Sequence, residues 1–373
     1  YTLWHTLSLH DALPISYAGG AGVVGLGAAY ADVDSTPETS AYLGPWVEVQ
    51  GADELVIDAT TTSDINVEGK GLVVGSVAVG VVIATAEETG NTAAYVDTGA
   101  KIGSPTAKVR SVSIQAKADQ TLAADTGAAA GGIVAGQGSV ATVEASPTVR
   151  AFTGDGSTIH VAEQLTIDGD TVIDTSAVAA GLTVAGAGAG VSLGTAMATP
   201  DIHTSVGSDA VIDAGQGISV VARQTTDELS STATASFGGL IGVAASDATT
   251  VLTPTVKATV GDGAELRGGS GEIVLSAIAG NKAAATSDGW VGAVAAWGAN
   301  SADARIEEAV TEAGIGAAVT VAADAVTVQA QAVNDAYASS TAGAGGVVVG
   351  ASADASTRID SETRAFIADS DAA

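Results

Sequence analysis

The fold class is decided by the stretch at residues 111–119, which reads SVSIQAKAD. Apolar or small side chains occupy every second position from Val112 to Ala118, and polar or charged side chains occupy the positions between them. Successive side chains of a β-strand point to opposite faces, so this alternation indicates a strand with one buried and one solvated face. An α-helix would spread the same residues around its circumference. The stretch is therefore predicted to be a β-strand.

The same pattern, apolar-x-apolar-x-small, occurs six times. Its middle residues are Ile57, Ile114, Ile167, Val220, Leu275 and Val328, so the spacings are 57, 53, 53, 55 and 53 residues. Two further elements share this period. Glycine-containing turns precede a short strand at residues 98–102, 154–159 and 261–266, and Gly/Ala/Val-rich runs occur at residues 71–86, 131–143, 238–245, 289–299 and 343–350. A unit of roughly 54 residues therefore repeats about six and a half times between residues 17 and 373.

A unit of this kind cannot bury its apolar face alone and must stack on its neighbours. Small interior residues and turn glycines favour an all-β fold, a β-solenoid. A right-handed parallel β-helix is expected because parallel crossovers are right-handed. With two or three coils per unit, the chain would be a rod about 60 to 95 Å long, at about 4.8 Å per coil. Residues 17–373 are predicted to form one continuous solenoid array, truncated at both ends.

Composition agrees with many thin apolar layers. Hydrophobic residues make up 46% of the chain, which is too many for a disordered protein, yet aromatic residues make up only 3%. Phe, Trp and Tyr normally bury the most area per residue in a thick core. The interior must therefore be filled by Val, Ile, Leu and Ala.

Charge and cysteine content exclude several functions. The net charge is −29, which repels nucleic acid and anionic lipid headgroups. The acidity is expected to keep a long apolar-cored object soluble. Because the chain has no cysteine, it has no disulfide, no thiolate metal site and no cysteine nucleophile.

The first sixteen residues are treated separately. Residues 5–16, HTLSLHDALPIS, resemble the translation of a short-read sequencing adapter. The segment at residues 1–16 is therefore predicted to be an artefact that lies outside the fold.

No catalytic, cofactor-binding or metal-binding residue is predicted. Outside the first sixteen residues there are two histidines, His160 and His203, each isolated in a strand or turn and expected to be a solvated surface residue. No metalloprotease or nucleophile-elbow motif occurs. The glycine-rich residues 186–190 are interpreted as structural, because no helix signal follows them.

Two features leave alternatives open. Residues 177–198 carry no charge over 22 residues, but they match the Gly/Ala/Val runs of other units, so we expect solenoid interior and no membrane insertion. The Gly-Asp-Gly turns at residues 154–156 and 261–263, with Asp32, Asp34 and Glu38, are interpreted as plain turns, and calcium is the one cofactor that they could hold.

The repeats resemble those of a known family. Gly/Ala-rich runs alternate with V-x-V-x-A strands, with the Ala-x-Val-Gly-Asp-Gly-Ala element at residues 258–264 and with RAFI at residues 364–367. This alternation resembles the repeat region of large filamentous adhesins of Gram-negative bacteria, of the leukotoxin type. The resemblance covers residues 17–373 and is compositional. It implies a secreted, surface-exposed β-helical stalk associated with the outer membrane.

Two function classes follow. The first is a structural and adhesive stalk that is not an enzyme and whose partner is a receptor or glycan on a host or neighbouring cell. The second is a β-helical carbohydrate-active enzyme, either a polysaccharide lyase or a glycoside hydrolase. An enzyme would concentrate irregularity in one unit, whereas the spacings here vary only from 53 to 57 residues, which favours the stalk.

Overall fold

The computed structural model describes the backbone of residues 2–368 and the side chains of residues 13–368. In these residues all regular structure is β-strand, and no helix is long and apolar enough to cross a membrane. The strands are β1 (Thr2–Ala12), β2 (Ile15–Ser35), β3 (Glu38–Leu43), β4 (Glu48–Val49), β5 (Glu54–Glu88), β6 (Asn91–Val96), β7 (Lys101–Ile102), β8 (Ser111–Ala145), β9 (Thr148–Thr153), β10 (Thr158–Val161), β11 (Gln164–Ala198), β12 (Asp201–Val206), β13 (Val211–Ala214), β14 (Gly217–Leu252), β15 (Thr255–Val260), β16 (Glu265–Arg267), β17 (Glu272–Ile315), β18 (Thr320–Ala322), β19 (Ala325–Gly345) and β20 (Val348–Ile367).

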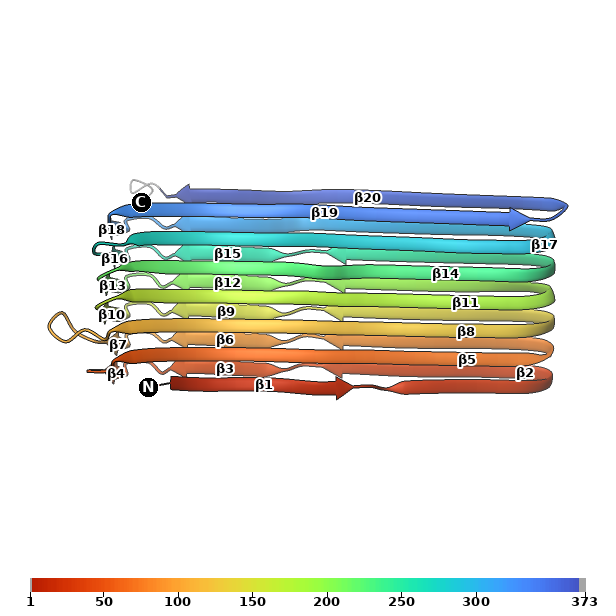
Figure 1. The fold of residues 1–373 in the computed structure, drawn as a ribbon, viewed down its shortest axis with the longest axis horizontal. Coiled ribbons are helices and arrows are strands. Elements are labelled where there is room, and N and C mark those ends of the chain that lie inside the picture. The colour runs from red at the N-terminus through yellow and green to blue at the C-terminus, as the bar shows by residue number, and fades with distance from the viewer. Residues whose placement is uncertain (1, 369–373) are drawn as a thin grey trace.

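The strands form a parallel β-solenoid, as the alternation and the period predicted. One sheet of 14 strands wraps around the molecule. A sheet of six short strands, from β4 to β18, forms the narrow edge opposite the bend (Figure 1). In Figure 1 the chain runs to the right in the near layer, bends, returns to the left in the far layer and rises to the next coil. This winding is right-handed. The layers are flat and wide, so the strand direction is the long axis of the molecule.

Each repeat makes one coil, which corrects the expectation of two or three. The register pairs Ile57 with Ile114, and Ile114 with Ile167, so residues one period apart are direct neighbours in the sheet. We number the coils from 1 to 7: β1–β4, β5–β7, β8–β10, β11–β13, β14–β16, β17–β18 and β19–β20. Seven stacked coils span about 30 Å rather than 60 to 95 Å, at about 4.8 Å per strand spacing.

The repeated apolar residues form one buried column. Ile57, Ile114, Ile167, Val220 and Leu275 have no exposed surface, as predicted. Val328 pairs with Leu275 but is only partly buried, because it lies in coil 7 and no further coil covers it. The prediction of burial is therefore confirmed for five of the six positions and is wrong for the last.

The interior near the bend is thin because glycine faces a branched side chain across it. A Cβ atom added to Gly69 or to Gly71 would lie 2.7 Å from a methyl carbon of Val82, which lies on the returning half of the same strand, β5. That separation is shorter than any normal carbon–carbon contact, so the two halves can approach this closely only with glycine at these positions. This explains how the fold is built with so few aromatic residues.

One glycine of each predicted turn adopts positive φ. Gly99, Gly156 and Gly263 have φ of 67°, 62° and 71°. They precede β7, β10 and β16 at equivalent positions. In coils 1, 4 and 6 the same position is held by Trp46, Asp209 and Ala318, with φ of 60°, 54° and 56°. These three residues therefore adopt a conformation that costs about 1–2 kcal/mol for an L-residue.

Residues 1–16 were expected to lie outside the fold. In the structure, Thr2–Ala12 form β1 and pair in parallel with β5, with a register shift between Leu9 and Ala12, and Ile15 begins β2. Residue 1 lies outside the described residues. An open solenoid end presents unpaired backbone groups, and a strand with alternating apolar residues can pair with them. The artefactual origin of the segment stays a prediction.

Candidate functional site

The short strands of the far layer, β3, β6, β9, β12 and β15, carry aromatic and basic side chains on the outer surface of the solenoid. We call their outward side chains the short-strand face. Tyr42, Tyr95 and Phe152 occupy one register column there and stack as parallel rings. The ring centroids are 5.1 Å apart for the first pair and 4.8 Å for the second, with interplanar angles of 8° and 2°. The strand spacing sets this ring spacing, so the stack follows from an aromatic residue repeated in register.

A polar column lies beside the rings. Arg150, His203 and Lys257 are register partners on β9, β12 and β15. The Arg150 guanidinium donates to the carboxylate of Asp201 over 2.7 Å, and His203 Nε2 lies 3.1 Å from the hydroxyl of Thr259. Burial, with the charge of Arg150, lowers the pKa of His203, so the imidazole is neutral near pH 7. The face thus combines hydroxyl, guanidinium and imidazole groups with apolar ring edges.

His160 is buried, which corrects the expectation of a solvated residue. It lies in β10 with 8% of its surface exposed, and its Nδ1 is 3.4 Å from Asp213 of the next coil. Lys108 makes a 2.9 Å ion pair with the same carboxylate. Burial alone would raise the pKa of Asp213, but the contacts with Lys108 and His160 outweigh it and hold the pKa below its ordinary value.

The loop at residues 103–110, between β7 and β8, supplies Lys108. It accommodates the longest repeat spacing and protrudes at the left of Figure 1. Val109 accepts a hydrogen bond from the backbone of Ala162 and donates one to the carbonyl of His160, so the loop covers the histidine. The cluster is thus a partly exposed ion pair beside a buried histidine, and sequence reasoning missed it because its members lie more than 50 residues apart.

Three carboxyl groups of β11 with raised pKa, those of Asp168, Asp170 and Asp174, lie on the outer face of the near layer, which we call the front face. Asp168 and Asp170 project from β11, and burial raises the pKa of each, although the charge of Arg223 opposes the effect. One oxygen of each carboxylate has no hydrogen-bond partner. Lys117 and Arg223 are the register neighbours of Asp170 on either side. This is the arrangement among the described residues that most resembles an acid–base pair.

The predicted calcium candidates lie in two places. In the turns, Asp155 and Asp262 each accept a hydrogen bond from a backbone N–H of the next coil, at 2.8 and 2.7 Å, so these carboxylates join successive coils. Asp34 lies in a register column with Glu87 and Glu144 on the outer surface. The charge of Glu144, more than burial or the nearby aspartates, raises the pKa of Glu87.

The described residues contain no group of three or more potential ligands that could hold a metal ion. Asp32 and Glu38 are exposed and belong to no such group. Calcium binding stays a prediction.

Glu88 is a buried carboxyl group that sequence reasoning did not single out. Its side chain is fully buried at the end of β5, and its Oε1 accepts hydrogen bonds from Ser63 and Gln120, at 2.6 and 2.8 Å. Its Oε2 has no partner. Burial raises the pKa of Glu88 in spite of these two bonds. Its register neighbour in coil 3 is Ala145, so the carboxyl group interrupts a column that continues with small and apolar residues.

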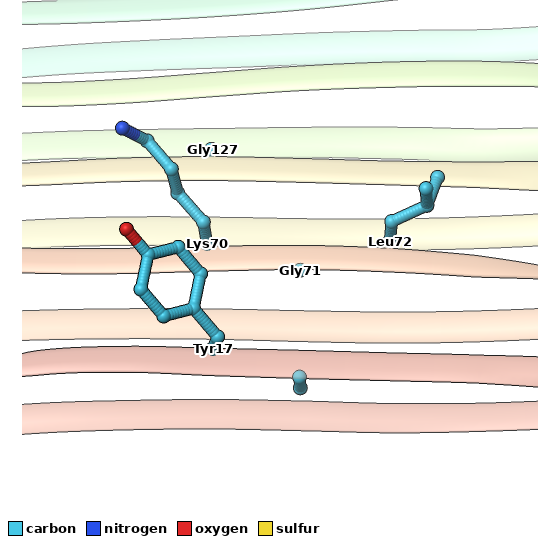
Figure 2. A pocket seen from close by; sticks show the side chains of 6 residues that line it. Tyr17, Lys70, Gly71, Leu72 and Gly127 are labelled. Atoms are coloured by element: carbon cyan, nitrogen blue, oxygen red, sulfur yellow. The ribbon is translucent and has the colours of Figure 1, made fainter.

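A shallow pocket of about 310 Å³ opens on the front face near the bend. Figure 2 shows the Tyr17 ring beside the Lys70 side chain, with Leu72 further along the strand. Gly127, the register neighbour of Lys70, adds no side chain on that side. Lys70 pairs with Glu68 and is the one ionisable side chain besides Tyr17 in the lining. The lining thus holds one ammonium group and one phenol group, and its other members are alanine, leucine and glycine.

The uncharged residues 177–198 are only half interior, which corrects the expectation for them. Ala177, Ala179 and Ala196 are buried, but Leu182 and Val184 are 48% and 55% exposed. Within residues 186–190 the chain bends at Gly186, and a Cβ atom on Gly188 would lie 2.3 Å from the carbonyl oxygen of Ala135. Gly186 and Gly188 are therefore required by close backbone packing.

The comparisons with known proteins add no relative: no family model, no curated protein and no solved structure matches this chain.

Proposed function

We propose that this chain is a structural and adhesive stalk segment of a secreted filamentous adhesin on the bacterial cell surface, associated with the outer membrane, and that it is not an enzyme. The observation that carries the proposal is the regular stacking of one coil per repeat over all seven coils. Such a stack makes the molecule longer with every repeat while its cross-section stays the same. This is a property that a stalk needs and an active site does not.

The short-strand face is the surface best suited to an adhesive contact. A glycan presents many hydroxyl groups, and the face supplies side chains that pair with them at Arg150, His203 and Tyr95, next to apolar ring edges. These side chains project from rigid strands, so little ordering is needed on binding. A host or neighbouring-cell glycan or glycoprotein is the partner that this chemistry favours.

The proposal is tested by binding of the purified chain to an array of mammalian and bacterial glycans. Arg150→Gln with His203→Gln removes cationic and imidazole groups at similar volume. Lys117→Gln with Arg223→Gln makes the matched change on the front face. We expect the first pair to weaken binding at least about tenfold and the second to leave it unchanged. Equal effects of both pairs, or no glycan retained, would contradict the assignment of this face.

The alternative, a β-helical carbohydrate-active enzyme, is favoured by one observation, the raised pKa of Asp168 and Asp170. Catalysis needs one such carboxyl group protonated and a second ionised at a suitable distance. Against it, the pair lies on the outside of a regular sheet. The test is a screen for turnover of acidic and neutral polysaccharides, with and without calcium. Activity that disappears in Asp168→Asn with Asp170→Asn would replace the stalk proposal by the enzyme.

A further inference from the structure

One edge of the solenoid carries no charge in any coil. The seven segments that the register aligns around the bend contain no Asp, Glu, Lys, Arg or His, although the chain as a whole has a net charge of −29. We call them the uncharged edge, which lies at the right of Figure 1: residues 18–29, 71–82, 128–139, 181–192, 235–246, 289–300 and 342–353. Since 15% of the chain is charged, the absence of charged residues from all seven segments is a property of the repeat and not a chance of composition.

The uncharged edge exposes large apolar side chains. On the front face, Leu72 and Val74 are 58% and 50% exposed, and Trp290 is 60% exposed. In a strand with one buried face, the outward positions are normally polar. Contiguous exposed apolar surface of this extent marks an interaction site.

The front side of this edge is ridged with a period of two coils. Coils 2, 4 and 6 carry Leu72, Leu182 and Trp290 in one register column, whereas coils 1, 3, 5 and 7 carry small residues, namely Gly19, Ala129, Ser236 and Gly343.

The next outward column repeats the pattern in coils 1 to 5. Coils 2 and 4 carry Val74 and Val184, and coils 1, 3 and 5 carry Ala21, Gly131 and Gly238. In coils 6 and 7 this column holds glycine. Ridges of large side chains therefore alternate with grooves, and the ridges are about 9.6 Å apart, which is twice the strand spacing.

We propose that the front side of the uncharged edge is an interface with a second copy of this chain. A copy turned by half a turn about the stacking axis and displaced by one coil sets its ridges into the grooves of the first. The charged parts of the two copies then point in opposite directions, which separates two bodies of like charge. The proposal concerns assembly and does not rest on the adhesive role.

The area reaches what a specific dimer needs. A displacement by one coil leaves six coils of each copy in contact, so six residues at about 3.3 Å and six coils at about 4.8 Å give roughly 570 Å² per copy and roughly 1,100 Å² in total. A specific interface buries more than about 1,000 Å². A lipid surface would also cover apolar side chains, but it has no features that match a ridge spacing. The ridges and grooves therefore favour a second copy, whose own ridges have the same spacing.

Filling the grooves tests the proposal, because it adds apolar surface while removing the fit. A Cβ atom on Gly238 meets nothing within 4 Å, and one on Gly131 meets only the carbonyl oxygen of Val184 at 3.8 Å, so the monomer accommodates both changes. We expect Gly131→Leu with Gly238→Leu to weaken dimerisation at least about tenfold. The control is Asn66→Leu with Thr121→Leu, which adds two leucines to exposed front-face positions outside the edge. It should leave dimerisation unchanged.

The measurement is sedimentation equilibrium of the purified chain at micromolar concentration, with circular dichroism to show that each variant keeps its β structure. As a second variant, Leu72→Asp with Leu182→Asp should also give monomers. A monomeric parent chain overturns the proposal, and so does undiminished dimerisation of the groove-filled variant. Flotation of a monomeric parent chain with phosphatidylcholine vesicles would assign the edge to lipid instead.

Discussion

Moving a methyl group from one half of β5 to the facing half tests whether the two halves of a coil pack against each other. Gly69 lies on the outgoing half of β5 and Val82 on the returning half, and a Cβ atom on Gly69 would lie 2.7 Å from Val82 Cγ1. Gly69→Ala therefore forces an overlap that costs about 1–3 kcal/mol. Val82→Ala removes two methyl groups from a fully buried side chain and costs about 2–3 kcal/mol.

The double variant should cost much less than the sum of the two single variants. The methyl group added at position 69 occupies space that Val82→Ala leaves empty, so we expect a coupling free energy of about 1–3 kcal/mol. Urea unfolding of the four proteins, with hydrogen exchange of β5 as a local readout, measures the cycle. As a control, Gly127→Ala adds a methyl group on the outer surface, 3.8 Å from Lys70, and should not couple to Val82→Ala. Strict additivity of Gly69→Ala and Val82→Ala would refute the reasoning, because residues that do not face each other cannot compensate.

Three further perturbations test other parts of the structure. Burial raises the pKa of Glu88, so the folded state binds the proton of this carboxyl group more tightly than the unfolded state. Stability should therefore fall as the pH rises above about 4.3. Urea midpoints measured against pH should show this slope, and Glu88→Gln should flatten it. Ala318→Gly should stabilise the chain by about 0.5–1 kcal/mol by relieving a positive φ, whereas Gly156→Ala, whose Cβ meets nothing within 4 Å, should destabilise it by a similar amount. A destabilising Ala318→Gly or a stabilising Gly156→Ala in thermal unfolding would contradict the turn assignment. Ile114→Asp places a charge in an apolar column and should cost several kcal/mol, with hydrogen exchange accelerated first in coils 2 to 4; unchanged exchange near residue 114 would count against the column.

The sequence was sufficient to predict the repeated strand, its register with the strands of neighbouring repeats and the buried column that contains Ile114. Alternation within residues 111–119 identifies the faces of one strand, and the recurrence of that pattern every 53 to 57 residues aligns Ile114 with its neighbours. Turn glycines such as Gly156 were predictable because positive φ favours glycine.

The coil count was not predictable, because a period gives the length of a repeat and not the number of turns in it. Strands usually have about five or six residues, so a unit of 54 residues suggested several short coils. Here β8 runs for 35 residues through a bend at Ile133 that no proline or asparagine marks. The Gly/Ala/Val runs were expected to be interior because they have apolar residues at both the inward and the outward positions of the strand.

Of the candidate sites, the clusters that depend on stacking were also missed. His160 meets Asp213 and Lys108 only because one coil equals one repeat and because the longest spacing inserts a loop above it. Likewise, no residue near Glu88 in the sequence predicts its hydrogen bonds with Ser63 and Gln120.

The central claim, that each repeat is one coil, is tested most directly by engineered disulfides in this cysteine-free chain. Ser113 and Thr166 are register partners on β8 and β11, and Ser219 is the partner of Thr166 on β14. A disulfide needs Cα atoms about 4.4–6.8 Å apart. With one coil per repeat, Ser113→Cys with Thr166→Cys should oxidise fully within the monomer, and Ser113→Cys with Ser219→Cys, about 9.6 Å apart, should not. With two or three coils per repeat, residues 113 and 166 would be about 10 to 14 Å apart, so failure of the first pair to cross-link would contradict the account.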